Sequence, residues 1–505
     1  MNLTPKDRAQ EFIKIAPQFR LGHLVTESFH PLTGQLSDLV KKDVAQGLAL
    51  LQRVDRDALK LMESKESILW QMAQDIQDTL SKGNKVFMVG CGATGRLSLV
   101  LETLFRQKYG TTNQVISFMA GGDYALIKSV ESFEDKIEYG ERQLLELGFG
   151  ANDLLLSSTE GGETPFVIGA TNLAAKVSSR SPYFLYCNPD ELLMPILRSK
   201  EVLENSKIHK VNLTVGPMAI SGSTRMQAST VLMLGIGVGL LYQHQSKTEF
   251  SHFYQDFLKR LTTSDYSQIA PLTRTEADLY LTQKYLNYVA DPNLAISILT
   301  DTTERSPTFS LMGFENRLDH GHKHALSYLF IPDTDDAHVA WAELLKRQPR
   351  ALEWEELNGR INQTILLGFD ISEHGRKMRS QDVSTEDFII QQNAGVVSFS
   401  CQSHRVSYEW GEDPLFNHLM VKMLLNAHST SIMGILGRYE GNVMTWVRSS
   451  NNKLIDRVAR YVSHLLARQG KNPEYEEVIE KIFEEAQELK DNEPIVLKVL
   501  DRFKS

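Results

Sequence analysis

Three short stretches rich in glycine and hydroxyl side chains have the composition of an anion-binding site. They are GCGATGR at 90–96, SSTEGGETP at 157–165 and SGSTRM at 221–226. Glycine lets the backbone approach a ligand closely, and the free N–H groups at a helix start favour negative charge. A phosphate ester is well held by N–H groups and short hydroxyl side chains. The sequence therefore predicts a site for a small anion, without saying which anion it is.

The first stretch also supports a second hypothesis. It follows an apolar run, opens a predicted helix at about 96–109 and matches the dinucleotide fingerprint G-x-G-x-x-G. A dinucleotide site needs an acidic residue near the end of the next strand to hold a ribose. Asp123 lies close to that place, although it follows a Gly-Gly pair. A tight turn without any ligand is the third interpretation, and the loop alone does not separate the three.

The composition excludes several classes of protein. The 505 residues carry 54 Lys and Arg against 63 Asp and Glu, a net charge of −9, so we expect no nucleic-acid or membrane partner. No apolar run reaches the roughly 18 residues that a membrane span needs. The three cysteines, Cys91, Cys187 and Cys401, are far apart, and the first residues, MNLTPKDRAQEF, lack the apolar stretch of a signal peptide. We therefore expect a cytoplasmic protein.

Short β-type runs alternate with helix-length segments, which predicts an α/β fold of parallel sheets flanked by helices. The first series of predicted strands covers 85–90, 114–120, 153–159, 182–187 and 210–216. A second series covers 295–300, 324–331, 363–371 and 394–401. We expect two three-layer αβα domains between helical ends. The expected boundaries are 1–65 (N-terminal helical segment), 66–250 (first domain), 251–289 (helical connector), 290–450 (second domain) and 451–505 (C-terminal helical cap).

Five segments together carry a resemblance to a known family. They are LVTESFHPLTGQL at 24–36, GCGATGRLS at 90–98, FMAGGDYALIKSVESFED at 118–135, VGPMAISGSTRMQAST at 215–230 and NVMTWVRSSNNKLIDRVARYV at 442–462. They resemble, in the same order, segments of the SIS (sugar isomerase) domain family. The likeness is to the branch of the N-acetylmuramic acid 6-phosphate etherases and the glucokinase regulatory protein. The second strand series is similar to the two-SIS layout of the latter.

The resemblance implies a pocket for a sugar phosphate and the residues that line it. Lys453, after Asn451, occupies the position of a lysine that reaches the bound ligand in this branch, and Glu315 resembles a glutamate that reaches it from the second domain. The implied substrate-binding residues are Gly92, Ala93, Thr94, Gly95, Glu160, Gly161, Gly162, Thr164, Ser223, Thr224, Arg225, Glu315, Asn451 and Lys453. From the residues alone, Ser223 would cap a helix and Lys453 would be solvated.

Carboxylates decide whether the chain can catalyse a reaction, because removing a proton beside a carbonyl needs a base within hydrogen-bond reach. Glu134 matches one of the two glutamates that the etherases use, so it is the predicted catalytic residue. The other position is Leu104 here, and Glu102 lies two residues away on another helix face. Glu160 and Glu163 also depart from the family loop, because they put negative charge beside the expected phosphate.

The second domain offers less chemistry. Arg305-Ser306-Pro307-Thr308 lies where its first loop is expected and has no glycine, which indicates a structural or lid role. His320, His322 and His324 alternate as metal ligands on a strand can, but no fourth ligand is evident. We expect neither a metal nor a cofactor.

Three functions remain open from the sequence. The first is an isomerase or lyase that acts on a hexose or amino-sugar 6-phosphate with Glu134 as base. The second is a regulator that binds a sugar phosphate and then a protein partner, as the glucokinase regulatory protein does. The third, a nucleotide-binding oxidoreductase, is disfavoured by the matches at 221–226 and 451–453.

Overall fold

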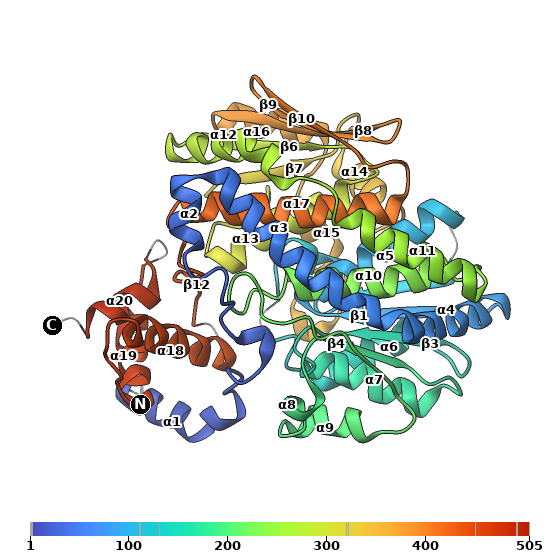
Figure 1. The fold of residues 1–505 in the computed structure, drawn as a ribbon, viewed down its shortest axis with the longest axis horizontal. Coiled ribbons are helices and arrows are strands. Elements are labelled where there is room, and N and C mark those ends of the chain that lie inside the picture. Colours follow the sequence, from blue (N-terminus) through green and yellow to red (C-terminus); the bar gives the residue numbers. More distant parts are fainter. Residues whose placement is uncertain are drawn as a thin grey trace.

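The computed structural model describes residues 4–110, 113–130, 132–319, 321, 323–449, 451–490 and 493–503. Two five-stranded sheets, each packed with helices, form the body of this part of the chain (Figure 1). A separate group of helices lies at one end. No described helix is both long and apolar enough to cross a membrane.

The first sheet is entirely parallel, with strand order β2-β1-β3-β4-β5. The strands are β1 (Val86–Gly90), β2 (Val115–Met119), β3 (Leu154–Ser158), β4 (Tyr183–Tyr186) and β5 (His209–Asn212). Strands β1 to β4 are buried along their whole length, as expected for a parallel sheet covered on both faces. All five lie within or overlap the predicted runs, so the α/β fold class is confirmed.

Helices flank this sheet. Helix α5 packs on β1 and β2, α10 packs on α4 and α5, and α6 packs on α7, which contacts β3. Their bounds are α4 (Glu66–Ser81), α5 (Gly92–Tyr109), α6 (Ile137–Glu146), α7 (Pro165–Val177), α8 (Asp190–Leu193), α9 (Leu197–Glu204) and α10 (Gln227–Leu241).

The second sheet is mixed, with order β10-β9-β8-β6-β7. Strands β7, β6 and β8 are parallel, whereas β9 and β10 continue the sheet as antiparallel hairpins. The strands are β6 (Tyr285–Ala290), β7 (Ser327–Phe330), β8 (Thr385–Asn393), β9 (Val396–Cys401) and β10 (His404–Glu409). Ala394 and Gly395 join β8 to β9 and both have positive φ, as two-residue hairpin turns require. The expectation of a wholly parallel second sheet is therefore wrong.

Two predicted strands of the second domain are also wrong. Residues 295–300 open helix α13 (Ala295–Phe309), and residues 363–367 form helix α15 (Gln363–Leu367). Helix α13 is buried on nearly every side, so its first turns show an apolar run without helical periodicity. Residues 305–308 consequently lie in the last turns of α13 and not in a strand–helix loop.

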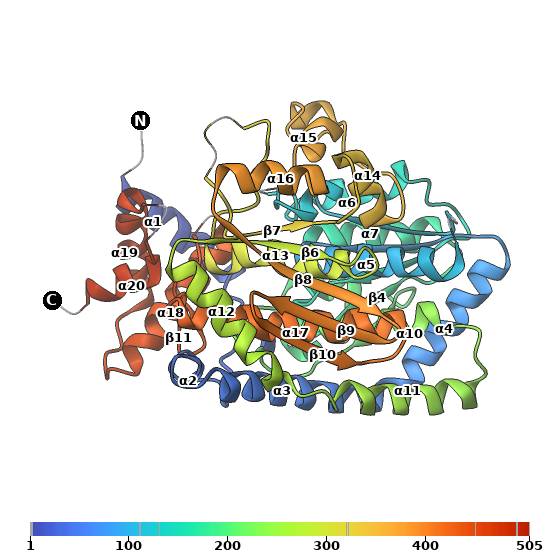
Figure 2. The same cartoon turned by 90° about the horizontal axis from the view of Figure 1, so that it is seen from above.

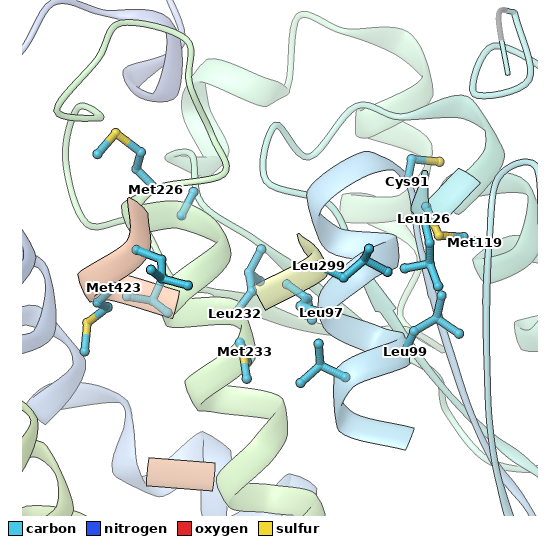
Figure 3. Close-up of a cluster of buried hydrophobic side chains, with 14 of the residues drawn as sticks. Cys91, Leu97, Leu99, Met119, Leu126, Met226, Leu232, Met233, Leu299 and Met423 are labelled. Carbon is cyan, nitrogen blue, oxygen red and sulfur yellow. The ribbon is translucent and has the colours of Figure 1, made fainter. Parts of the chain in front are cut away.

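Helices from both domains share one core. Helix α17 (Pro414–Ile435) packs against α10 and α13, and α13 also contacts α5. Figure 3 shows Leu97 of α5, Met233 of α10 and Leu299 of α13 in one cluster of buried side chains. The remaining helices of this body are α2 (Leu36–Lys42), α3 (Val44–Leu61), α11 (Lys247–Leu261), α12 (Ala270–Leu281), α14 (Ala337–Leu345) and α16 (Glu373–Asp382).

The chain ends pack together. Helix α1 (Pro5–Ile15) contacts α19 (Tyr475–Glu488), and α19 packs on α18 (Asn452–Ala467) and α20 (Ile495–Asp501). Figures 1 and 2 show this group at one end of the molecule, with α18 as its inner member. A two-stranded ribbon, β11 (Tyr439–Glu440) and β12 (Val443–Met444), precedes it.

Buried ion pairs lock the second domain onto the edge of the first sheet. Glu102 is 1% exposed and accepts hydrogen bonds from Arg350 at 2.8 Å and Arg347 at 3.2 Å. Asp123 accepts from Arg347 at 2.6 and 3.1 Å. Burial would raise the pKa of Glu102, but the two arginines lower it to about 2. Asp123 is thus engaged by arginine, which weakens the dinucleotide hypothesis.

We predict that Arg347→Met destabilises the protein by about 3–5 kcal/mol, because it leaves buried carboxylates short of a partner. The midpoint of chemical denaturation measures the change. Arg274→Met is the matched control, since the Arg274–Asp278 pair is about half exposed and contributes about 0–1 kcal/mol. Equal losses in the two variants would contradict the structural role of Arg347.

Candidate functional site

The predicted loops border a cavity of about 270 Å³ at the carboxyl ends of β1 and β3. The residue that precedes α7 and the first turns of α5 and α18 also line it. Its lining residues are Leu21, Leu24, Thr26, Glu27, Cys91, Gly92, Ala93, Glu134, Glu160, Gly161, Glu163, Thr164, Gly222, Thr224, Pro307, Asn451, Lys453, Leu454 and Arg457. The structure thus brings together nine of the predicted site residues: Gly92, Ala93, Glu134, Glu160, Gly161, Thr164, Thr224, Asn451 and Lys453.

The first loop divides into a part that faces the cavity and a part that packs. Gly92 has φ +51 and no atom within 4 Å of where a Cβ would be, so it leaves open space beside the helix start. Thr94 instead accepts a hydrogen bond from the backbone of Cys91 at 2.9 Å. A Cβ on Gly95 would lie 2.4 Å from the side chain of Met119. Thr94 and Gly95 therefore shape the turn and are not lining residues.

The second loop lies opposite the first and contributes charge. Glu160, Gly161, Glu163 and Thr164 line the cavity, and Thr164 is the residue before α7. Gly162 has φ +77, and its amide donates to the hydroxyl of Thr159 at 3.2 Å. It therefore shapes the turn and is not a lining residue.

The third stretch contributes less than predicted. Gly222 and Thr224 line the cavity, whereas Ser223 is buried and its amide bonds to Ile220 within a turn. Arg225 is placed away from the cavity, where it donates to Asp301 of α13 at 3.1 Å. It joins the two domains through its ion pair with the buried carboxylate of Asp301.

Helix α18, the first helix of the C-terminal group, forms another side of the cavity. Asn451 caps it by accepting from the amide of Leu454 at 2.9 Å. Lys453 donates to Glu163 at 2.7 Å. Arg457 and Arg460 hold the buried carboxylate of Glu27, at 2.5 and 2.7 Å.

Two of the four cavity carboxylates are paired with cations. Burial would raise the pKa of Glu163, but Lys453 and Arg198 lower it to about 2. Burial acts on Glu27 in the same way, and Arg457 with Arg460 lowers that pKa to about 2. Both groups are therefore ionised at neutral pH.

The other two carboxyl groups lack such partners. Burial raises the pKa of Glu134, and the charge of Glu163 raises it further although Lys453 opposes the rise. Burial raises the pKa of Glu160 to about 7, and Glu304 of α13 contributes in the same direction. The Oε1 atom of Glu160 is buried and has no hydrogen-bond partner among the described residues. Both groups therefore keep their protons to higher pH than an exposed carboxyl group does.

Other predicted residues lie elsewhere. Glu315 accepts from Arg379 at 2.7 Å and contacts His324 at 3.1 Å, so it belongs to the interior of the second domain. Pro307 is the second-domain residue that borders the cavity. His320 and His322 lie outside the described residues. Across the described ranges, no three His, Cys, Asp or Glu side chains are grouped to hold a metal ion.

Sequence reasoning missed Glu27 and Arg457 as members of the site. The two residues are separated by 430 positions and meet only because α18 folds back onto the first domain. Both lie within segments that carry the family resemblance, at 24–36 and 442–462, which was the one signal that could have identified them.

Comparisons with known proteins agree with this geometry. Residues 68–175 match the family model of the glucokinase regulatory protein N-terminal SIS domain. An N-acetylmuramic acid 6-phosphate etherase of Yersinia pestis is 32% identical over 218 residues, which are 42% of this chain and 68% of that protein. An etherase of the same name from Yersinia pseudotuberculosis has the same identity and coverage.

Solved structures with similar folds also exist. Tagatose-6-phosphate ketose/aldose isomerase from Escherichia coli has a TM-score of 0.43 and 9% identity, covering 82% of this chain and 97% of its own. The C-terminal domain of glucosamine-fructose-6-phosphate aminotransferase from Francisella tularensis has a TM-score of 0.38 and 9% identity, covering 77% and 96%.

The parallel sheet with loops converging on a cavity at its carboxyl edge defines an α/β protein with a pocket at the ends of its strands. More narrowly, the chain belongs to the SIS domain family, in the branch of the N-acetylmuramic acid 6-phosphate etherases and the glucokinase regulatory protein.

We predict that Arg457→Gln releases α18 from the first domain, because it breaks a buried pair and leaves Glu27 less compensated. The expected loss of stability is about 3–5 kcal/mol. Hydrogen exchange should be faster in α18 than in β1 to β4. Lys200→Gln, in the exposed Lys200–Glu204 pair, is the control and should change neither quantity. Unchanged protection of α18 would contradict the prediction.

Proposed function

We propose that the chain binds a phosphorylated sugar, a hexose or amino-sugar 6-phosphate, in the 270 Å³ cavity and acts on it as an isomerase or lyase. The observation that carries the proposal is the meeting of three helix starts and Lys453 around one enclosed space. Each helix start favours an anion. The etherase relatives are named for a sugar 6-phosphate, which supports the same ligand class.

In this proposal the phosphate lies near the start of α5, beside Gly92 and Ala93. The hydroxyls of Thr164 and Thr224 and the ammonium of Lys453 complete its contacts. Lys453 is already bonded to Glu163, so an incoming phosphate competes with that carboxylate. Arg198 also holds Glu163 and can keep it paired when Lys453 turns to the ligand.

The proposed chemistry uses Glu134 as a base at the carbon beside the sugar carbonyl. Its raised pKa brings it closer to neutral pH, where a base can both accept and return a proton. Residues 66–250 would bind the ligand, while the 290–450 domain would support the cavity through α13 and Pro307. The 451–505 cap would close it. A reducing compartment, the cytoplasm, suits the three cysteines, which are all unpaired thiols.

A regulatory function is the alternative. The family model that matches is that of the glucokinase regulatory protein, and Leu104 is fully buried in the core where an etherase has its second glutamate. In that case the sugar phosphate would change the affinity for a protein partner, and Glu134 would only bond to a sugar hydroxyl.

We predict that hexose and hexosamine 6-phosphates raise the melting temperature of the protein and that Lys453→Ala abolishes the shift. Binding to the folded state stabilises it by mass action. A thermal-shift panel that includes NAD(P) is the measurement, with the exposed Lys200→Ala as control. Protection by NAD(P) and not by any sugar phosphate would refute the proposal and favour the oxidoreductase hypothesis.

Glu134→Gln separates enzyme from regulator. If Glu134 is the base, wild-type protein exchanges the C2 hydrogen of a bound sugar phosphate for solvent deuterium, and the variant loses this exchange by about 10²- to 10⁴-fold while still binding. Nuclear magnetic resonance of the sugar measures the exchange. Tight binding by wild type without any exchange would favour the regulator.

A further inference from the structure

We propose that Glu160 is the proton donor that works opposite Glu134 in the same cavity. This inference rests on the proposed function and adds a second catalytic residue to it. Proton removal beside a carbonyl leaves negative charge on the carbonyl oxygen. A base removes the proton but does not stabilise that charge. The site therefore needs an acid that reaches the sugar from a different side.

The position of Glu160 fits that role. It lies two residues after the end of β3, and its backbone carbonyl accepts a hydrogen bond from the amide of Cys187 at 3.1 Å. The residue is 9% exposed and lines the cavity. Its Oε1 atom has no partner in the described chain. A buried polar atom left without a partner is unfavourable and indicates a site where a ligand or water completes the bonding.

Glu160 and Glu134 reach the cavity from separate elements. Glu134 lies in the segment that leads to α6, where its backbone carbonyl accepts from Phe166 at 3.0 Å. Both carboxyl groups raise the pKa of the Cys91 thiol, which burial raises in the first place, so both lie near the residue at the start of α5. A sugar bound beside α5 is then flanked by the two groups.

The surroundings favour the protonated form of Glu160. Burial raises its pKa to about 7, and Glu304 adds to that rise from α13, while Lys453 and Lys422 oppose it from α18 and α17. Glu160 also interacts with the thiols of Cys91 and Cys187, whose pKa values burial raises and its charge raises further. Lys453 is held by Glu163, so no nearby cation forms an ion pair with Glu160 in the described structure.

The proposed step moves one proton from C2 to Glu134 and one proton from Glu160 to the carbonyl oxygen. The carboxylate of Glu134 takes the proton from C2 of the open-chain aldose, and the C2–H electron pair forms the C1=C2 bond. The electrons of the C1=O double bond move to the oxygen, which takes the proton of Glu160. The product is an enediol, with Glu134 protonated and Glu160 ionised. For isomerisation, Glu134 returns a proton to C1 while the O2 hydroxyl gives its proton to Glu160 and becomes the ketose carbonyl. For exchange, a solvent-derived deuteron on Glu134 returns to C2 while the O1 hydroxyl gives its proton back to Glu160 and C1=O re-forms.

The test is C2 exchange in deuterated water with Glu160→Gln across a range of pH. The neutral amide preserves size, so sugar-phosphate binding and folding should persist, whereas exchange should fall about 10²- to 10⁴-fold. In wild type, kcat/KM should fall as pH rises through about 7, when Glu160 loses its proton. That alkaline limb should be absent from the residual activity of the variant. Glu201→Gln on the exposed face of α9 is the control.

A second variant tests why kcat/KM falls at high pH. Glu304→Gln removes a like charge that favours the protonated form, so the alkaline limb should move to lower pH with little change in binding. Infrared spectroscopy of the ligand-free protein should show a protonated carboxyl band that titrates near pH 7 and that Glu160→Gln removes.

The outcomes separate the two proposals. A wild type that binds no sugar phosphate refutes the proposed function itself. A wild type that binds and exchanges, with Glu160→Gln equally fast, overturns only the role of Glu160. Binding without exchange also overturns that role, and the regulatory function is then the candidate that remains. A Glu160 that is already ionised at pH 5 in the infrared spectrum overturns it whatever the ligand does.

Discussion

The balance of charge in the cavity determines much of what this protein can do. Four carboxyl groups line the cavity: Glu27, Glu134, Glu160 and Glu163. Among its lining residues the cations are Lys453 and Arg457. Buried carboxylates without a cation are strongly unfavourable. Two of the four are therefore paired and ionised, and the other two have raised pKa values. The shortage of cations thus creates the acid and base groups that the proposed chemistry uses.

The second domain acts on this balance without supplying a binding loop. Glu304 of α13 raises the pKa of Glu160 from across the domain boundary, and Pro307 borders the cavity. The pairs of Glu102 and Asp123 with Arg347 and Arg350 hold that domain in place. A domain whose residue at the cavity, Pro307, belongs to a helix and not to a binding loop can in this way still influence the chemistry of its neighbour.

The sequence predicts the first sheet well because its strands are short, apolar and separated by complete helices. The strands of the second sheet are harder to predict from the sequence. Helix α13 is buried on all sides and so shows no helical periodicity, and the hairpins of β8 to β10 have the half-buried patterns of an edge. The turn at Ala394 and Gly395 was a usable signal, since the chain reads Asn-Ala-Gly there.

For the site, glycine and hydroxyl patterns located the loops but did not give the direction of single side chains. Arg225 turns to Asp301, and Thr94 turns to its own loop, because each finds a nearer buried partner. The pairing of Glu27 with Arg457 depends on contacts between the two ends of the chain. Local pattern carries no information about such a contact, and only the family resemblance pointed to those segments.

The same balance of charge also distinguishes the two candidate functions. A phosphate dianion adds negative charge to a cavity that has few cations, so it binds best when Glu134 and Glu160 are both neutral. A regulator gains nothing from ionising either group. An enzyme must accept weaker binding, because Glu134 can take a proton only as a carboxylate while Glu160 keeps its own. Burial raises the pKa of both groups, that of Glu160 to about 7, and Lys453 opposes the rise at each of them. An ionised Glu134 beside a protonated Glu160 is the division of roles that proton transfer requires and that simple binding does not.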